Sequence, residues 1–176
     1  KLQLPDICLR TPYSQLQATV DMDMNAFADR NPGKLMAQLK GALGRSDLFL
    51  FAGDAFPSAM KKKWPFYPMK IEGSFKGNTQ QASFSGLKLS LPTAFELSAD
   101  GSLSNMTDMN RLKANVDLKA RTYHLDFVTA MLDPSLMQEI RVPSGIGIRG
   151  NIQADGSRYA TRLAITEGRG RMKVDA

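Results

Sequence analysis

Residues 111–121 alternate between polar and apolar side chains without interruption, and this pattern constrains the fold more than any other feature of the chain. One parity holds the apolar residues Leu112, Ala114, Val116, Leu118 and Ala120. Charged and amide residues fill the other parity. A period of two is typical of a β-strand, whose successive side chains point to opposite faces, and a strand of this length spans about 36 Å. The sequence therefore predicts a long strand with one apolar face and one hydrated face.

The same alternation recurs along most of the chain and predicts a mainly β protein. We expect about ten strands, at residues 15–22, 34–43, 47–51, 69–76, 84–91, 95–100, 111–121, 145–154, 158–166 and 170–176. Residues 34–43 also fit a helical period of 3.6, but Gly41 and Gly44 would weaken a helix, which favours the strand. Strands with one polar and one apolar face, joined by turns, indicate an antiparallel sheet.

Two inserts break the alternation and predict at most three short helices. Residues 55–68 contain three prolines and favour one helical turn at residues 57–62. The second insert, residues 126–140, places apolar residues at helical spacing behind Asp126, a candidate N-cap. Pro134 suits the first position of a further helical turn.

We expect residues 1–176 to form a single β-rich segment of a longer protein, because the chain begins without methionine and ends within an alternating pattern. Weak repeats begin near residues 67, 91 and 142. Each repeat starts with a proline, continues with alternating residues, and reaches a glycine seven to nine residues later. A spacing near 25 residues indicates stacked hairpins.

The charge distribution argues against nucleic acid as a partner. The formal net charge is +6, but the only tight run of cations is Lys61–Lys63, whereas a nucleic-acid binder clusters its cations with aromatic residues. The remaining cations form either a solvated face or a face near anionic lipid headgroups. Cys8 is the only cysteine, which excludes an internal disulfide and a cysteine zinc site.

No pattern in the chain predicts catalysis, a metal site or a cofactor. His124 is the only histidine, and no serine lies in a nucleophile-elbow sequence, so we interpret His124 as a residue at a strand end. Asp21 and Asp23 share one strand face, which we interpret as solvated. Asp100–Gly101 and Asp155–Gly156 are interpreted as turns. We therefore do not expect an enzyme.

The order of these parts resembles the TamB proteins of the Bacteroides group, within the wider AsmA-like superfamily. The likeness rests on the proline-led alternating segments, the strand at 112–120, the helical insert after it, the step Val142–Pro143, the closing residues 167–171, and residues 50–53 with their proline-rich sequel. No single motif is diagnostic, but the similarity extends over nearly the whole chain.

The resemblance implies an elongated antiparallel sheet folded into a taco-like apolar groove. It implies a periplasmic protein anchored to the inner membrane by a helix outside this segment, with phospholipid acyl chains and an outer-membrane barrel of the TamA/BamA type as partners. The expected function is to shield acyl chains during phospholipid transport between the two membranes. The alternative is an assembly module that pairs its strands with a barrel partner or client.

The hypothetical groove lining consists of residues on the apolar parities. These are Leu87, Leu89, Leu91, Phe95, Leu97, Leu112, Ala114, Val116, Leu118, Ile146, Ile148, Ile152, Leu163 and Ile165. The same pattern also fits a closed sandwich, in which these residues would pack against one another. Unpaired terminal strands would in either case favour edge-to-edge self-association.

Overall fold

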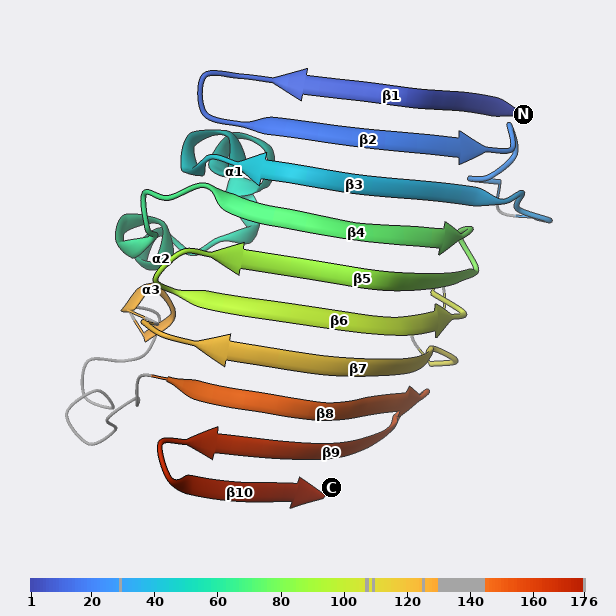
Figure 1. The fold of residues 1–176 in the computed structure, drawn as a ribbon. Coiled ribbons are helices and arrows are strands. Elements are labelled where there is room, and N and C mark those ends of the chain that lie inside the picture. The colour runs from blue at the N-terminus through green and yellow to red at the C-terminus, as the bar shows by residue number, and fades with distance from the viewer. Residues whose placement is uncertain (29, 107, 109, 125, 130–144, 176) are drawn as a thin grey trace.

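The computed structural model describes residues 1–175 apart from 29, 107, 109, 125 and 130–144. Within these residues the chain forms one ten-stranded sheet (Figure 1). Its strands are β1 (Leu2–Arg10), β2 (Gln15–Met22), β3 (Leu35–Leu43), β4 (Met69–Gly77), β5 (Gln81–Leu91), β6 (Phe95–Ser104), β7 (Lys113–Thr122), β8 (Ile146–Asp155), β9 (Arg158–Glu167) and β10 (Gly170–Asp175). The helical elements are α1 (Arg45–Ala52), η1 (Gly53–Ala55), α2 (Ser58–Lys63) and α3 (Asp126–Thr129).

Strand order in the sheet follows chain order, and each neighbouring pair is antiparallel. The expected mainly β, antiparallel fold with short helical inserts is thereby confirmed. Val116 of β7 lies opposite Gly101 of β6 and Ile152 of β8. Residues in such cross-strand pairs share a face, so the alternation within each strand continues across the sheet. The described strands form a single layer, and no second sheet closes over it within the described residues.

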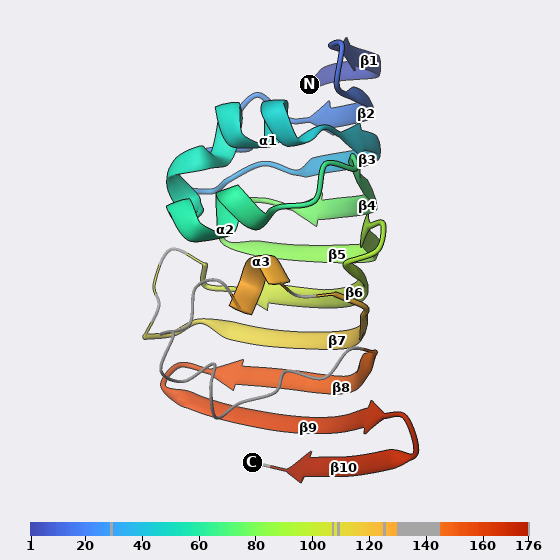
Figure 2. The same ribbon diagram turned by 90° about the vertical axis from the view of Figure 1, so that its left-hand side faces the viewer.

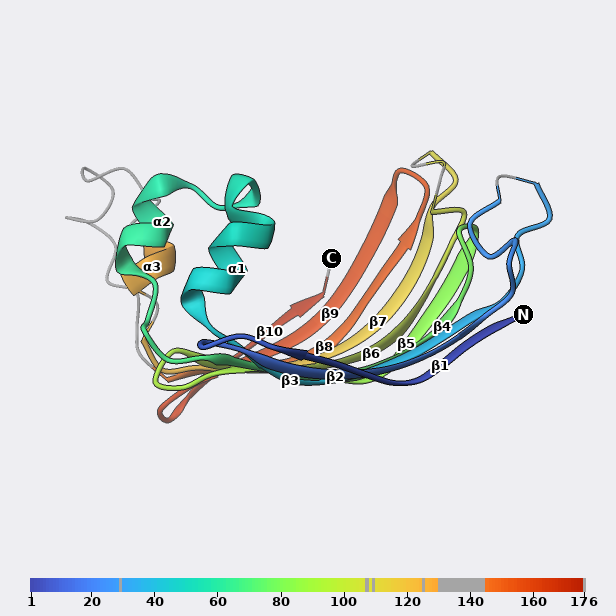
Figure 3. The ribbon, with the colours of Figure 1, turned by 90° about the horizontal axis from the view of Figure 1, so that it is seen from above.

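The sheet is curved, and all the helices lie on its concave side (Figure 3). One cause of bending is a β-bulge in β5, where the register with β6 shifts between Phe84 and Leu87. Gly86, at the bulge, has a φ of +60°, which suits glycine, and its N–H donates to Asp100 Oδ1 at 2.6 Å. A bulge bends its strand and increases the local twist. A second register shift interrupts β1 where it pairs with β2.

A helical cap, defined as α1, η1, α2 and α3, lies over one end of the strands (Figure 2). The buried residues beneath it are Leu48, Trp64, Leu91, Ala94 and Phe127. Leu91 and Ala94 come from the β5–β6 hairpin, whereas the other three come from the two inserts, so this small core joins the cap to the sheet.

Aromatic rings give the core its shape. Trp64 meets Phe49, Phe56 and Phe127 edge-on, at centroid distances of 5.8, 5.5 and 4.9 Å. Phe127 also contacts Phe95 of β6, at 6.2 Å between centroids. Edge-to-face pairs of this kind are worth about 0.5–1.5 kcal/mol each beyond the area they bury. The cap is therefore held to the sheet by specific ring packing.

Three local predictions were wrong. Residues 47–51 were predicted as a strand but belong to α1. Periodicity does not distinguish a strand from a buried helix in a run as short as the four apolar residues 48–51. Asp100 and Gly101 lie inside β6, where Asp100 accepts from the bulge in β5, so they form no turn. The sequence prediction also missed β1, so the total of ten strands was reached only by counting residues 47–51 as a strand. The interpretation of Asp155–Gly156 as a turn is confirmed, since Gly156 follows β8 with a φ of +60°.

The remaining predicted elements agree closely with the structure where it describes them. The helical turn predicted at residues 57–62 corresponds to α2, and the strand favoured over a helix at residues 34–43 corresponds to β3. The further helical turn predicted at Pro134 and the start of the third repeat near residue 142 lie outside the described residues. Among those that are described, no helix is long and apolar enough to cross a bilayer.

Candidate functional site

The apolar face, defined as the sheet face that carries the helical cap, gathers the apolar parity of all ten strands. Register links its members from strand to strand: Leu4 pairs with Val20, Val20 with Ala37, and Ala37 with Phe75. Further along the sheet, Ile148 of β8 pairs with Ile165 of β9. Ten strands at roughly 4.8 Å spacing make this face about 45 Å long across the strands.

Most of the residues predicted to line a groove do share this face. Those that lie in strands on the apolar face are Leu87, Leu89, Leu91, Phe95, Leu97, Ala114, Val116, Leu118, Ile146, Ile148, Ile152, Leu163 and Ile165. Leu112 comes just before β7, and its carbonyl accepts from the Gly156 N–H at 2.7 Å. The structure thus brings the predicted set together, from β5 to β9.

Two of these residues are not available to a ligand. Leu91 is fully buried in the core beneath the helical cap, and Phe95 packs against the same core. Leu91 belongs to the same buried cluster as Trp64 and Phe127, and the Phe95 ring contacts Phe127. We therefore restrict the candidate site to the open apolar face, defined as the apolar face without the core and the residues packed against it.

Most side chains of the open apolar face remain partly exposed, although Ala82 and Ala99 are buried between their neighbours. Val116, Leu118 and Ile148 are each of intermediate burial, although they lie in the middle of long strands. At the β1 edge, Leu4 and Leu9 are 39% and 43% exposed. In the residues described, only the helical cap lies over this side of the sheet.

The accessible surface of the whole chain is correspondingly large. It measures 12297 Å² for 19.4 kDa, whereas a compact monomer of that mass exposes about 8,500 Å². Exposed apolar patches on monomeric proteins are seldom larger than a few hundred Å² unless they bind something. The open apolar face, about 45 Å long across the strands, is therefore a candidate binding surface.

Sequence reasoning missed part of the apolar face. Phe84 has the opposite parity to Leu87, yet both lie on this face, because the bulge at Gly86 shifts the phase. Ser85–Gly86 in the middle of an alternating run was the available signal, since an isolated glycine within a strand often marks a bulge. In β1, Leu4 and Ile7 are likewise separated by a register shift that hides the alternation.

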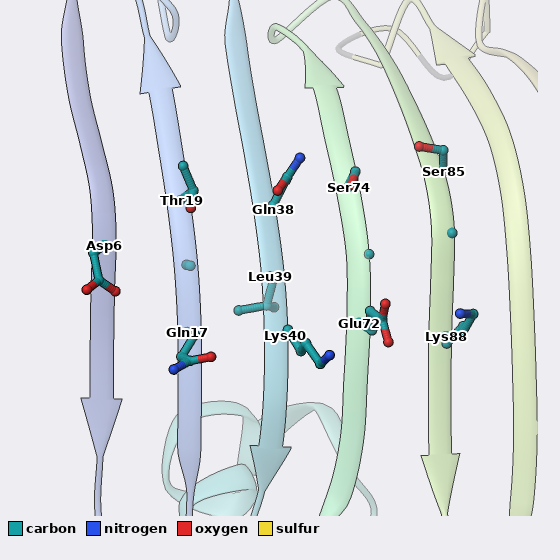
Figure 4. A pocket seen from close by; sticks show the side chains of 13 residues that line it. Asp6, Gln17, Thr19, Gln38, Leu39, Lys40, Glu72, Ser74, Ser85 and Lys88 are labelled. Carbon is teal, nitrogen blue, oxygen red and sulfur yellow. The ribbon is translucent and has the colours of Figure 1, made fainter.

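The opposite face of the sheet is polar. Figure 4 shows a shallow depression there, about 410 Å³ in volume, lined by side chains from the first five strands. Its labelled lining includes Gln17, Lys40, Glu72 and Lys88. Further along, the Asn151 amide donates to Asn115 Oδ1 at 2.7 Å and to the Asp117 carboxylate at 3.0 Å. We interpret this face as hydrated, because polar side chains make up most of the lining of the depression and Ala18 and Leu39 are its only apolar side chains.

Two carboxylates have shifted titration, and both serve the fold. Hydrogen bonds from Ser14 and then Thr11 lower the pKa of Asp47, which ties the β1–β2 turn to α1. Hydrogen bonds from Lys1 and then Gln3 lower the pKa of Asp21.

The groups considered for catalysis or metal binding do not converge. Asp23 accepts from the Lys34 N–H at 2.9 Å, which closes the β2–β3 loop, and His124 is exposed after β7. No group of three or more histidine, cysteine or acidic residues that could hold a metal ion occurs in the described part of the chain. Cys8 is an exposed free cysteine on β1.

Comparisons with known proteins give no relative: no family model, no curated protein and no solved structure matches the chain.

Proposed function

We propose that the chain is a β-groove segment that shields the acyl chains of phospholipids, as in a TamB-like protein of the periplasm. The observation that carries the proposal is the open apolar face, which continues from β1 to β10 while the polar residues occupy the other side. A continuous apolar surface without a shaped pocket suits a ligand that is long, flexible and uniform in its chemistry.

The energetics favour such a surface for lipid. Each buried CH₂ contributes about 0.8 kcal/mol, so two sixteen-carbon chains cost on the order of 20 kcal/mol to move through water. A face about 45 Å long could replace that single barrier by many small steps. Small residues such as Ala114, Ala120 and Ala154 leave room above the sheet for acyl chains.

The curvature of the sheet supports the same proposal. The open apolar face lies on the concave side, where the cap stands at one end and the strands bend at the other (Figure 3). An acyl chain lying across the strands would contact successive apolar residues, such as Ala120 of β7, Ile148 of β8 and Ile165 of β9. Its headgroup would stay in water beyond the open side.

Site-specific photocrosslinking tests the proposal. A photoreactive amino acid is placed at Val116, on the apolar face of β7, and at its neighbour Asn115, on the polar face, in cells that produce the protein. We expect phospholipid to crosslink to Val116 and not to Asn115. If Val116 crosslinks to neither lipid nor protein, no acyl chain reaches the face at β7, and the proposed shielding function is wrong.

A second candidate function is the pairing of an outer strand with a nascent or partner β-strand. The observation that favours it is the open order of the sheet, in which β1 and β10 each have one neighbour among the described strands. Such edges present unpaired N–H and C=O groups to an added strand. A barrel of the TamA/BamA type, or a second copy of this chain, would be the partner.

Two measurements separate this candidate from lipid shielding. Crosslinks from Val116 to unfolded outer-membrane proteins would favour strand pairing over lipid transport. Sedimentation at several concentrations should show self-association of the isolated chain through its edges. A monomer that is independent of concentration would contradict the expected edge pairing.

A further inference from the structure

The helical insert between β3 and β4 presents large apolar side chains to solvent. Leu50 and Phe51 of α1 are 76% and 70% exposed, and Phe66, after α2, is 85% exposed. Tyr67 beside it is 55% exposed. Scattered single exposures of this kind are ordinary, but four of them within eighteen residues of one small insert are not.

The inner side of the insert fixes these residues in place. Phe49 and Phe56 pack edge-on against Trp64, which is 5% exposed, and Leu48 is buried beneath them. Phe66 is held by the Arg45 guanidinium, whose carbon lies 4.7 Å from the ring centroid. The insert is thus apolar on two sides. Its inner side packs against the core beneath the cap, whereas Leu50, Phe51 and Phe66 on its outer side are exposed to solvent in the described structure.

Cations accompany the exposed apolar residues. Lys61, Lys62 and Lys63 form the last turn of α2; Lys62 and Lys63 are exposed to solvent and Lys61 is half-buried. The Lys61 ammonium lies close to the end of α1, at 3.5 Å from the position that a Cβ on Gly53 would occupy. The only exposed acidic residue in the insert is Asp54, since Asp47 is buried and hydrogen-bonded.

We propose that this insert docks the protein on an anionic membrane surface. The docking surface consists of Leu50, Phe51, Lys61, Lys62, Lys63, Phe66 and Tyr67. Aromatic and aliphatic side chains enter the boundary between headgroups and acyl chains, while lysines attract the anionic headgroups. The inference goes beyond acyl-chain shielding and stands without it, because surface docking does not require lipid on the sheet.

Charge decides between a membrane and a second copy of the chain. A symmetric dimer through the same surface would bring both lysine runs into one interface, since a two-fold interface uses the same patch on both subunits. Like charges in contact disfavour that arrangement, whereas an anionic surface complements it. The run of lysines and the exposed rings therefore point to lipid headgroups.

Vesicle flotation of the purified protein tests the lysines. We expect binding to phosphatidylcholine vesicles that contain phosphatidylglycerol, and little binding to phosphatidylcholine alone. Replacement of Lys61, Lys62 and Lys63 by glutamine should weaken the partition onto anionic vesicles by about a hundredfold, at roughly fivefold for each lysine. High salt should weaken binding of the unaltered protein as well.

The matched control removes three charges from the polar face of the sheet. Lys40→Gln, Lys76→Gln and Lys88→Gln alter exposed lysines on the side away from the cap and give the same net charge. Its binding should stay close to that of the unaltered protein. Equal losses in both triple variants would mean that net charge alone drives binding, which overturns the proposed docking surface.

The apolar half of the surface has its own pair of variants. Leu50→Gln with Phe51→Gln should reduce vesicle binding by about tenfold or more. The control is Met24→Gln with Phe27→Gln, two comparably exposed residues in the loop that follows β2. This double variant should leave vesicle binding unchanged. Trp64 fluorescence, from the only tryptophan, confirms that the core beneath the cap is intact in each variant.

Two further outcomes would overturn the inference. One is equal binding of the unaltered protein to neutral and anionic vesicles, with no effect of either cap variant. The other is self-association that the Leu50/Phe51 variant abolishes while no variant alters vesicle binding, since that result would assign the surface to a second copy.

Discussion

The covered and open parts of the apolar face are built from the same alternating strands but differ in what lies over them. At the covered end Leu91 is fully buried, and Phe127 of the cap is 4% exposed. In the open part Leu118 has the same residue type and lies on the same face of the sheet, yet it is only half-buried. Alternation thus determines which face of a strand is apolar. It does not determine whether protein, lipid or water covers that face.

The two parts should contribute differently to stability. Apolar area stabilises a fold only where it is buried, at about 25 cal/mol per Å², so the core beneath the cap should contribute more per residue than the open face. The strands of the open part are held chiefly by ladder hydrogen bonds and neighbouring side chains. If the open face binds lipid, part of its apolar area would be buried only in the bound state.

The largest effect is expected from Trp64→Ala. The Trp64 ring contacts Phe49, Phe56 and Phe127, so its removal opens a cavity in the middle of the small core. We expect the free energy of unfolding to fall by about 3–5 kcal/mol in denaturant titration. Phe27→Ala, at a residue that is 66% exposed, should stay within about 0.5 kcal/mol of the unaltered protein.

A matched pair of leucines tests the comparison directly. Leu91→Ala should lower the free energy of unfolding by about 2–5 kcal/mol, because Leu91 is completely enclosed. Leu118→Ala should cost about 1 kcal/mol, since its side chain is partly in water already. Thermal melts of both variants measure the difference. Equal losses would show that the two parts of the apolar face are equally covered in solution.

Much of this fold could be predicted from period-two alternation, and the failures have identifiable physical causes. Residues 47–51 form part of a helix whose Asp47 is hydrogen-bonded to the β1–β2 turn and whose Leu48 is buried in the core, and no local pattern records these tertiary contacts. Phe84 was omitted from the apolar face because a bulge shifts the phase by one residue. The long alternating strand β7 contains no bulge and needs no distant contact to be recognised. It begins only two residues after its predicted start.

The candidate site could be predicted less completely than the fold. Sequence reasoning found the apolar face from β5 to β9, but it could not separate Leu91 and Phe95 from the open residues. That distinction depends on where the helical cap sits, and the position of the cap follows from ring contacts between distant segments, such as Trp64 with Phe127. Parity alone carries no information of that kind.

A smaller effect is expected at the bulge that bends the open part. Gly86 has a φ of +60° and nothing within 4 Å of its missing Cβ, so Gly86→Ala tests backbone conformation without a clash. We expect a loss of about 1–2 kcal/mol in the free energy of unfolding. Gly53→Ala, whose φ of −59° suits any residue, is the control and should cost little. A neutral Gly86→Ala variant would show that β5 adapts its register without strain.

The mildest change concerns pH and acts where the cap meets the β1–β2 turn. Ser14 and Thr11 donate to Asp47, whose pKa they lower from its usual value near 3.8. A lowered pKa means that this contribution to stability is fully present above the unfolded-state value and is lost as pH falls through the folded-state value. The melting temperature of the unaltered protein should therefore fall in acid, and that of the Asp47→Asn variant should fall less.

The control is Asp54→Asn, which removes an exposed charge from the same insert. Its melting temperature should depend on pH as that of the unaltered protein does. The melting temperature of Asp47→Asn could instead fall in acid as much as that of the unaltered protein. That result would show that packing, and not the Asp47 charge, joins the cap to the β1–β2 turn. The covered part of the apolar face would then be stable without that charge.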